Sequence, residues 1–69
     1  MSQCEKVLAH LKAKGSITPR EAYELYGIMR LGARIYDLKH RGHRIREETE
    51  ESRNRYGERV RYARYKLEA

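Results

Sequence analysis

Apolar residues recur at three- and four-residue intervals in three stretches of the chain, which is the spacing of helices that bury one face. In the first stretch these residues are Cys4, Val7, Leu8 and Leu11. Ser2 and Glu5 have the spacing of a capping box, and Gly15 can take the left-handed conformation that ends a helix. The pattern therefore predicts a first helix over about residues 3–14.

The next two stretches have clear boundary signals. Thr18 suits an N-cap and a proline follows it at the first helical position, so a second helix is predicted over about residues 19–25. Residues 26–28, Tyr-Gly-Ile, interrupt the periodicity as a turn, because the glycine can adopt a positive φ. A third helix is predicted over about residues 29–41, ending before Gly42 with basic residues in its last turn.

Short β-prone segments accompany the helices. Residues 16–17 are predicted as a minimal strand, residues 43–46 as a second strand and residues 58–67 as a third strand. Residues 47–57 are almost wholly polar and are predicted as the loop of the hairpin between the last two strands. Three helices with a two- to three-stranded sheet in this order predict a mainly α winged helix-turn-helix fold, in which that loop is the wing.

We expect a single domain over residues 1–69, with the helix-turn-helix at 18–41 and the wing hairpin at 43–67. Its core is predicted to contain Val7, Leu8, Leu11, Ile17, Ala22, Leu25, Ile28, Leu31, Ile35, Leu38, Ile45 and Val60. Tyr23, Tyr26 and Tyr62 are expected at the edge of that core, because a tyrosine hydroxyl tolerates partial burial.

The charge distribution limits the classes of partner that the chain can bind. The 69 residues carry a formal net charge of +6, and six Lys or Arg residues against a single acid lie between residues 30 and 46. This concentration of basic residues indicates a polyanionic partner, which can be nucleic acid, an anionic membrane surface or an acidic protein. A basic surface that is merely solvated is the alternative.

Other classes of function find no support in the residues. A lone Cys4 excludes an internal disulfide and a four-ligand zinc set, and His40 and His43 have no third ligand nearby. No hydroxyl is linked to a base and no glycine-rich phosphate cradle is present, so no enzyme, metal or cofactor is predicted. The chain shows no apolar run of a membrane span and no signal peptide, so we expect a cytoplasmic protein without membrane contact.

The outer face of the third helix is the candidate surface for reading DNA, because the apolar stripe that begins at Leu31 faces the core. Base contacts are predicted for Met29, Arg30, Ala33, Arg34 and Asp37. Arg30 can bond guanine O6 and N7 together, and Ala33 can contact a thymine methyl group. Gly32 would let the backbone come close to DNA.

Two of these residues have a second interpretation. Arg34 can instead reach a phosphate or pair with Glu21 or Glu24 of the second helix. Asp37 can accept a hydrogen bond from cytosine N4, or it can orient a neighbouring arginine of its own helix.

Phosphate contacts are predicted from the later part of the helix into the strand, for Tyr36, Lys39, His40, Arg41 and Arg44. Such contacts position a protein on DNA without reading its sequence. The alternative for Lys39 and Arg41 is that they only complement the helix dipole.

The wing mixes both signs of charge. Its predicted tip is Arg53, Asn54 and Arg55, which suit a minor groove or flanking phosphates. The four glutamates before the tip would face away or pair with Arg44 and Arg46. Three more arginines follow in the third strand, Arg59, Arg61 and Arg64. These either extend the phosphate contacts or pair with the glutamates across the hairpin.

The segment SITPREAYELYGIMRLGARIYDLKHRGHRI resembles the small winged helix-turn-helix domains that are common in phage and prophage genes. The shared pattern is an I-T-x-x-E-A helix, a Y-G-I turn, and an R-L-x-A-R-I-x-D-L-x-x-x-G-H-x-I helix and strand. The resemblance is close over residues 15–45 and looser up to residue 67. It implies this fold and DNA binding, with Arg30, Arg34 and Asp37 on the recognition helix.

Three hypotheses follow. The first is a sequence-specific double-stranded DNA-binding protein, a phage or prophage transcriptional regulator with its third helix in the major groove, in the cytoplasm or nucleoid of a bacterial host. The second is an excisionase-like factor that bends DNA and recruits a recombinase. The third is an interaction module that binds a host protein. A homodimer is open in each case, through an exposed edge of the third strand at Tyr62, Tyr65 and Leu67.

Overall fold

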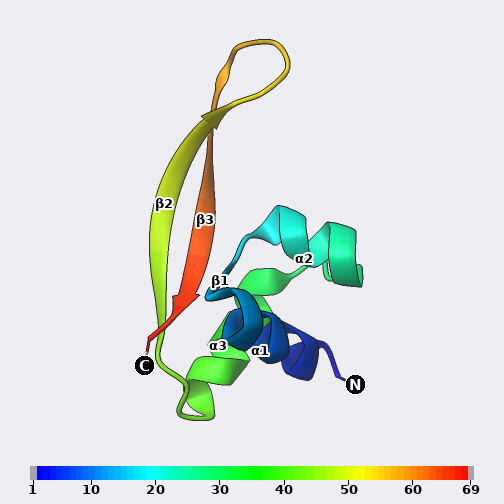
Figure 1. Cartoon of the computed structure of the whole chain (residues 1–69), viewed down its shortest axis with the longest axis vertical. Coiled ribbons are helices and arrows are strands. Elements are labelled where there is room, and N and C mark those ends of the chain that lie inside the picture. The colour runs from blue at the N-terminus through cyan, green and yellow to red at the C-terminus, as the bar shows by residue number, and fades with distance from the viewer. Residues whose placement is uncertain (1, 69) are drawn as a thin grey trace.

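Three helices pack together at the base of a β-hairpin that projects away from them (Figure 1). The computed structural model describes residues 2–68. The elements are α1 (Gln3–Lys14), β1 (Ser16–Ile17), α2 (Pro19–Tyr26), α3 (Leu31–His40), β2 (Ile45–Arg53) and β3 (Arg59–Leu67). The strands form an antiparallel sheet in the order β1-β3-β2. The predicted architecture of three helices with a three-stranded sheet is confirmed.

The first two helices begin at capping boxes, as their sequences predict. The backbone N–H of Glu5 donates to Ser2 Oγ at 3.2 Å, and the N–H of Ser2 donates to Glu5 Oε1 at 3.5 Å. Thr18 and Glu21 repeat the arrangement at 3.2 and 2.9 Å. Gly27 ends α2 at a φ of +66°, a conformation that favours glycine. These local signals fix where the chain enters α2 and where it turns toward α3.

The third helix begins two residues later than predicted. Met29 and Arg30 precede it, and Arg30 is an N-cap residue with φ −118° and ψ 64° and no side-chain cap. The N–H of Ile28 donates to the carbonyl of Ala22 at 3.1 Å, which holds the turn against α2. The chain becomes helical only from Leu31, so Met29 and Arg30 lie at the entrance of α3.

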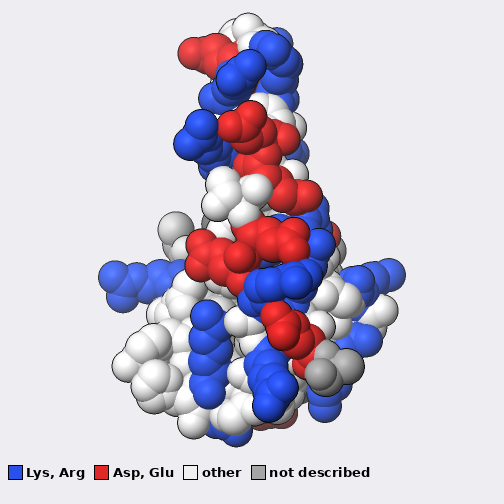
Figure 2. All heavy atoms as spheres, turned by 90° about the vertical axis from the view of Figure 1, so that its left-hand side faces the viewer, with Lys and Arg blue, Asp and Glu red and all other residues white. Residues whose placement is uncertain are grey.

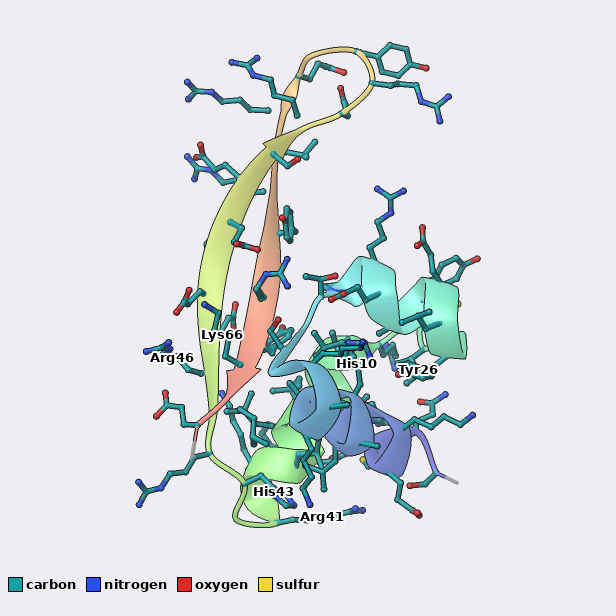
Figure 3. All side chains as sticks on the ribbon, viewed as in Figure 1. His10, Tyr26, Arg41, His43, Arg46 and Lys66 are labelled. Atoms are coloured by element: carbon teal, nitrogen blue, oxygen red, sulfur yellow. The ribbon has the colours of Figure 1, made fainter. Side chains whose placement is uncertain are left out.

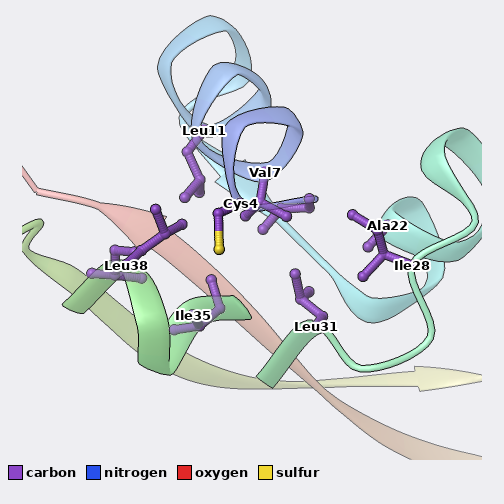
Figure 4. Close-up of a cluster of buried hydrophobic side chains, with 10 residues drawn as sticks. Cys4, Val7, Leu11, Ala22, Ile28, Leu31, Ile35 and Leu38 are labelled. Atoms are coloured by element: carbon purple, nitrogen blue, oxygen red, sulfur yellow. The ribbon is translucent and has the colours of Figure 1, made fainter. Parts of the chain in front are cut away.

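The core lies between the helices and the base of the sheet (Figure 4). Its buried residues are Cys4, Val7, Leu11, Ile17, Ala22, Ile28, Leu31, Ile35, Leu38 and Ile45. The prediction that Leu25 and Val60 belong to the core is wrong, because Leu25 on α2 is 61% exposed and Val60 is 37% exposed. Leu8 only packs against the edge of the core. The short helix α2 buries Ala22 alone, and Val60 lies in the projecting part of the hairpin.

A buried polar pair joins α1 to the end of α2 (Figure 3). His10 is 6% exposed, and its Nδ1 lies 2.7 Å from the Tyr26 hydroxyl. The two rings meet edge to face, with centroids 5.6 Å apart. His10 Nε2 is buried with no hydrogen-bond partner among the described residues. Tyr26 packs against the core as predicted. Tyr62 is half-buried but is not among the residues that pack against the core, and Tyr23 is 59% exposed.

The strand β2 is much longer than the sequence predicted. It pairs with β3 over nine residues, from Ile45 opposite Leu67 to Arg53 opposite Arg59. Most of the predicted loop over residues 47–57 is therefore strand. The outer part of the hairpin is exposed, so its strands carry no alternation of apolar and polar residues.

The edge of β3 that the sequence left open for a homodimer contact is partly occupied. β1 pairs with it through Ser16 opposite Lys66 and Ile17 opposite Tyr65. The N–H of Leu67 also donates to the carbonyl of residue 15 at 3.3 Å. At Tyr65 and Lys66 this edge of β3 is therefore paired with β1 and is not exposed, contrary to expectation. β2 is the outer strand on the other side of the sheet.

Candidate nucleic-acid interface

The helix α3 has one buried face and one exposed face. Leu31, Ile35 and Leu38 are at most 3% exposed and face the core. On the outside, Met29 just before the helix is 81% exposed and Tyr36 is 62% exposed. The predicted division of this segment into a core stripe and an outer face is therefore confirmed.

Two residues predicted to contact bases are engaged with each other and with α1. Arg34 Nη2 lies 3.3 Å from Asp37 Oδ2, and Arg34 Nη1 donates to Gln3 Oε1 at 3.3 Å. The thiol of Cys4, also on α1, lies 3.9 Å from the same Asp37 oxygen. Arg34 Nε is buried and has no partner within residues 2–68. These contacts turn the pair toward α1.

The predicted pairing of Arg34 with the acids of α2 is wrong. Glu24 pairs with Arg20 at 2.9 Å one helical turn away, and this contact raises the pKa of the Arg20 guanidinium. Glu21 caps α2 and lies 3.9 Å from Arg64 of β3. The alternative that Asp37 orients an arginine of its own helix is confirmed, with Arg34 as that arginine.

The later part of α3 keeps its polar groups on the surface. Tyr36 and His40 stack with ring centroids 4.1 Å apart and planes 32° from parallel, so each ring restricts the other. Lys39 is exposed, and Arg41 is the C-cap residue, its side chain at the end of the helix far from the hairpin tip (Figure 3). Arg44 is exposed in the segment before β2. This end of the domain presents several cationic side chains together.

The cationic side chains at the two ends of α3 have no acidic partner in the described part of the chain. Arg30, Lys39, Arg41 and Arg44 form no ion pair with any residue in the described range 2–68. Ala33, half-buried, and the exposed Gly32 lie between these cations on the helix. The outer side of α3 therefore combines small and apolar residues with unpaired positive charge at both ends.

The turn at the tip of the hairpin is built around Asn54. Its Oδ1 accepts hydrogen bonds from the N–H groups of Tyr56 and Glu58 at 2.9 and 3.1 Å, and its Nδ2 donates to Glu58 Oε1 at 3.3 Å. Arg53 Nη1 donates to the carbonyl of Gly57 at 2.7 Å. Asn54 thus shapes the turn, and Arg55 stands exposed beside it with no ion pair in the described chain.

The glutamates of β2 pair mainly across the hairpin, which was one of the predicted alternatives. Glu51 pairs with Arg61 at 3.1 Å, and Glu50 pairs with Arg64. The hydrogen bond from Arg64 lowers the pKa of the Glu50 carboxyl and raises that of the guanidinium. Glu48 lies 3.1 Å from Lys66 and 2.9 Å from Arg46. The pairs with Arg61, Arg64 and Arg46 were predicted, the pair with Lys66 was not, and the predicted pairing of Arg44 with these glutamates is absent within residues 2–68.

Arg59 does not follow this pattern. It lies opposite Arg53 in the strand register, and like charges directly across a sheet repel each other. The tip therefore carries Arg53, Arg55 and Arg59. Figure 2 shows the result, with red side chains gathered across the middle of the hairpin and mostly blue ones at its tip and around the base. Arg53 and Arg55 were predicted at the tip, whereas the place of Arg59 depends on the strand register, which the sequence alone did not give.

Within residues 2–68, no three His, Cys, Asp or Glu side chains come together as they would around a metal ion. No helix in that range has the length and apolar character needed to cross a membrane.

A family model described as a winged helix-turn-helix domain matches residues 2–69. The chain belongs to the winged helix-turn-helix family. No curated protein and no solved structure matches it. In this domain, α2 and α3 are the helices of the predicted helix-turn-helix, and the β2–β3 hairpin is the segment predicted as the wing.

Membership of the winged helix-turn-helix family indicates DNA binding in general. Two surfaces of the domain suit it: the outer side of α3 with its unpaired cations, and the arginine-bearing tip of the wing. The paired acids of β2 separate these surfaces.

Proposed function

We propose that the domain is a sequence-specific double-stranded DNA-binding protein that inserts α3 into the major groove and regulates transcription from a phage or prophage. The observation that carries the proposal is the distribution of ion pairs. The cations in the middle of the wing are paired with glutamates, whereas Arg30, Lys39, Arg41 and Arg44 around α3 have no acidic partner among residues 2–68. Unpaired cations are the ones that replace counterions on phosphates.

A salt titration tests DNA binding itself. Affinity for a fluorescent duplex should fall as salt rises, with a log–log slope of about −0.9 for each phosphate that the protein neutralises. An affinity that does not change between low and moderate salt would contradict binding through phosphates.

Substitutions of two arginines distinguish a contact with bases from a contact with phosphates. Arg30→Ala should reduce discrimination between the preferred duplex and an unrelated one, because Arg30 stands at the helix entrance. Arg41→Ala should weaken both duplexes alike and reduce the salt slope by about 1. Arg61→Ala is the control for net charge, since Arg61 is already paired with Glu51. Equal effects of all three variants would argue against a defined reading surface.

The regulatory role is supported by the resemblance of residues 15–45 to phage and prophage domains. A reporter gene placed behind the preferred site in a bacterial host should change its expression when the protein is present. A gel-shift assay with phased sites tests the excisionase-like alternative, which requires the protein to bend DNA and thereby help a recombinase.

A further inference from the structure

Beyond Arg30, the part of α3 that faces outward near its start offers few hydrogen-bonding groups. Arg34 and Asp37, the polar residues of its first two turns, are held against α1 by Gln3 and by each other. Beside the exposed Arg30, the residues left on this outer side are Met29, Gly32 and Tyr36, with Ala33 half-buried among them. Met29 and Tyr36 are 81% and 62% exposed, so a large apolar area faces solvent at the centre of the proposed DNA surface.

Gly32 has no structural reason to be glycine. It lies inside a helix and is not among the glycines with positive φ. An added Cβ would meet only the Tyr65 hydroxyl at 3.8 Å, an ordinary contact distance. Glycine is among the least favourable residues in a helix, so its presence weakens α3. A glycine at this position is explained if a binding partner must approach the backbone of α3 closely.

Tyr36 is also held in place. Its ring stacks on His40 at a centroid distance of 4.1 Å, which limits the rotation of an otherwise exposed side chain. A restrained aromatic ring loses less entropy when it contacts a partner. The apolar surface around Gly32 is therefore already arranged before binding.

We propose that this surface recognises the 5-methyl groups of thymine bases in the major groove. The thymine methyl is the apolar group that base edges present in that groove, whereas the other groups there are hydrogen-bond donors and acceptors. Met29, Ala33 and Tyr36 supply apolar contacts, and Gly32 lets them approach. The unpaired Arg30 and Lys39 favour a polyanion over an apolar protein surface. The inference rests on the proposed DNA binding and adds the class of sequence that is read.

Replacing thymine by deoxyuridine tests the inference, because this substitution removes only the methyl group. The best duplex from an in vitro selection is measured with deoxyuridine at each thymine in turn. Thymines under α3 should lose about fourfold in affinity per methyl group, the value of one buried carbon. Thymines in the flanks of the same duplex serve as controls. Equal affinity for all substituted duplexes overturns the inference while DNA binding stands, and no binding to any duplex overturns the proposed function as well.

Matched variants locate the effect on α3. Tyr36→Ala and Met29→Ala should reduce the ratio of thymine to deoxyuridine affinity toward one. Tyr23→Ala and Leu25→Ala on α2 are controls of similar exposure, 59% and 61%, and should leave that ratio unchanged. If the α2 variants lower the ratio as much as the α3 variants, the assignment to this surface is wrong.

The variant Gly32→Ala should change DNA affinity and thermal stability in opposite directions. The substitution should raise the thermal midpoint, because alanine favours the helix and the added Cβ has room. It should also weaken binding of the selected duplex severalfold, since the new methyl group keeps the helix away from the bases. Unchanged or tighter binding by this more stable variant would contradict the close approach.

Discussion

At the scale of single residues, the contact between His10 and Tyr26 connects the first helix to the helix-turn-helix. The Tyr26 hydroxyl lies 2.7 Å from His10 Nδ1, where α1 packs against the end of α2. His10 is buried there and Tyr26 is half-buried. A buried polar group that loses its partner keeps the cost of leaving water. This pair therefore holds the turn before α3 at a fixed place on α1.

Removing the hydroxyl should weaken the fold. Tyr26→Phe keeps the ring but leaves His10 Nδ1 without its partner, so we expect a loss of about 1–2 kcal/mol in the free energy of unfolding. Urea denaturation followed by circular dichroism measures it. Tyr23→Phe, on an exposed side chain, is the matched control and should leave the free energy unchanged. Equal effects of the two variants would show that the contact with His10 contributes nothing.

Contacts between residues that are far apart in the sequence could not be predicted from the sequence. A helical wheel separates the core stripe of α3 from its outer face, and this separation was correct. The wheel gives no position for α1, so it could not show that Gln3 and Cys4 would approach Arg34 and Asp37. The wheel likewise gave no signal for the pairing of His10 with Tyr26, which is 16 residues away.

At the scale of elements, local chemistry decided how well each boundary was predicted. The capping boxes at Ser2 and Thr18 place the starts of α1 and α2, because their hydrogen bonds involve neighbours three residues apart. The wing was predicted poorly for the opposite reason. Its strands are stabilised by pairs such as Glu51 with Arg61, ten residues apart, and the polar composition of β2 resembles that of a loop.

The wing should also respond to pH through Glu50. Its pKa is lowered from the ordinary value of 4.5 by the hydrogen bond from Arg64. A carboxyl with a lowered pKa in the folded state stabilises the fold above its unfolded pKa, and this contribution is lost as the pH falls through the folded pKa. The thermal midpoint should therefore fall more steeply between pH 5 and about pH 3 for the natural chain than for Glu50→Gln.

Arg64→Ala supplies the control for this pH effect. In that background the Glu50→Gln substitution should change the pH profile less, because the largest cause of the lowered pKa is gone. A difference of the same size in both backgrounds would assign the effect to another interaction of Glu50.

At the scale of the whole molecule, the two cationic surfaces stand far apart. The domain measures 39 Å along its longest axis, with the wing tip at one end and Arg41 near the other (Figure 3). The glutamates of β2 and their partners neutralise the stretch between them. We expect two separate groups of phosphate contacts.

This separation predicts additive effects on DNA binding. Arg55→Ala at the tip and Arg41→Ala at the helix should each lower affinity, and the double variant should lose the product of the two fold-changes, because distant sites act independently. Fluorescence anisotropy at constant salt measures all three. Lys39→Ala with Arg41→Ala, two neighbours on one helix end, is the comparison in which additivity should fail. An Arg55→Ala variant that binds like the natural chain would exclude a contact by the wing.

The outer strand β2 has one further consequence. A nine-residue strand at the edge of a sheet can template pairing with another molecule, which leads to aggregation. If two copies of β2 paired antiparallel about Thr49, Glu48 would meet Glu50 and Glu47 would meet Glu51. Like charges at these positions oppose the pairing. The acidic run that gives the wing its mixed charge thus also protects the domain against self-association, and substituting these glutamates with glutamine should make the protein aggregate.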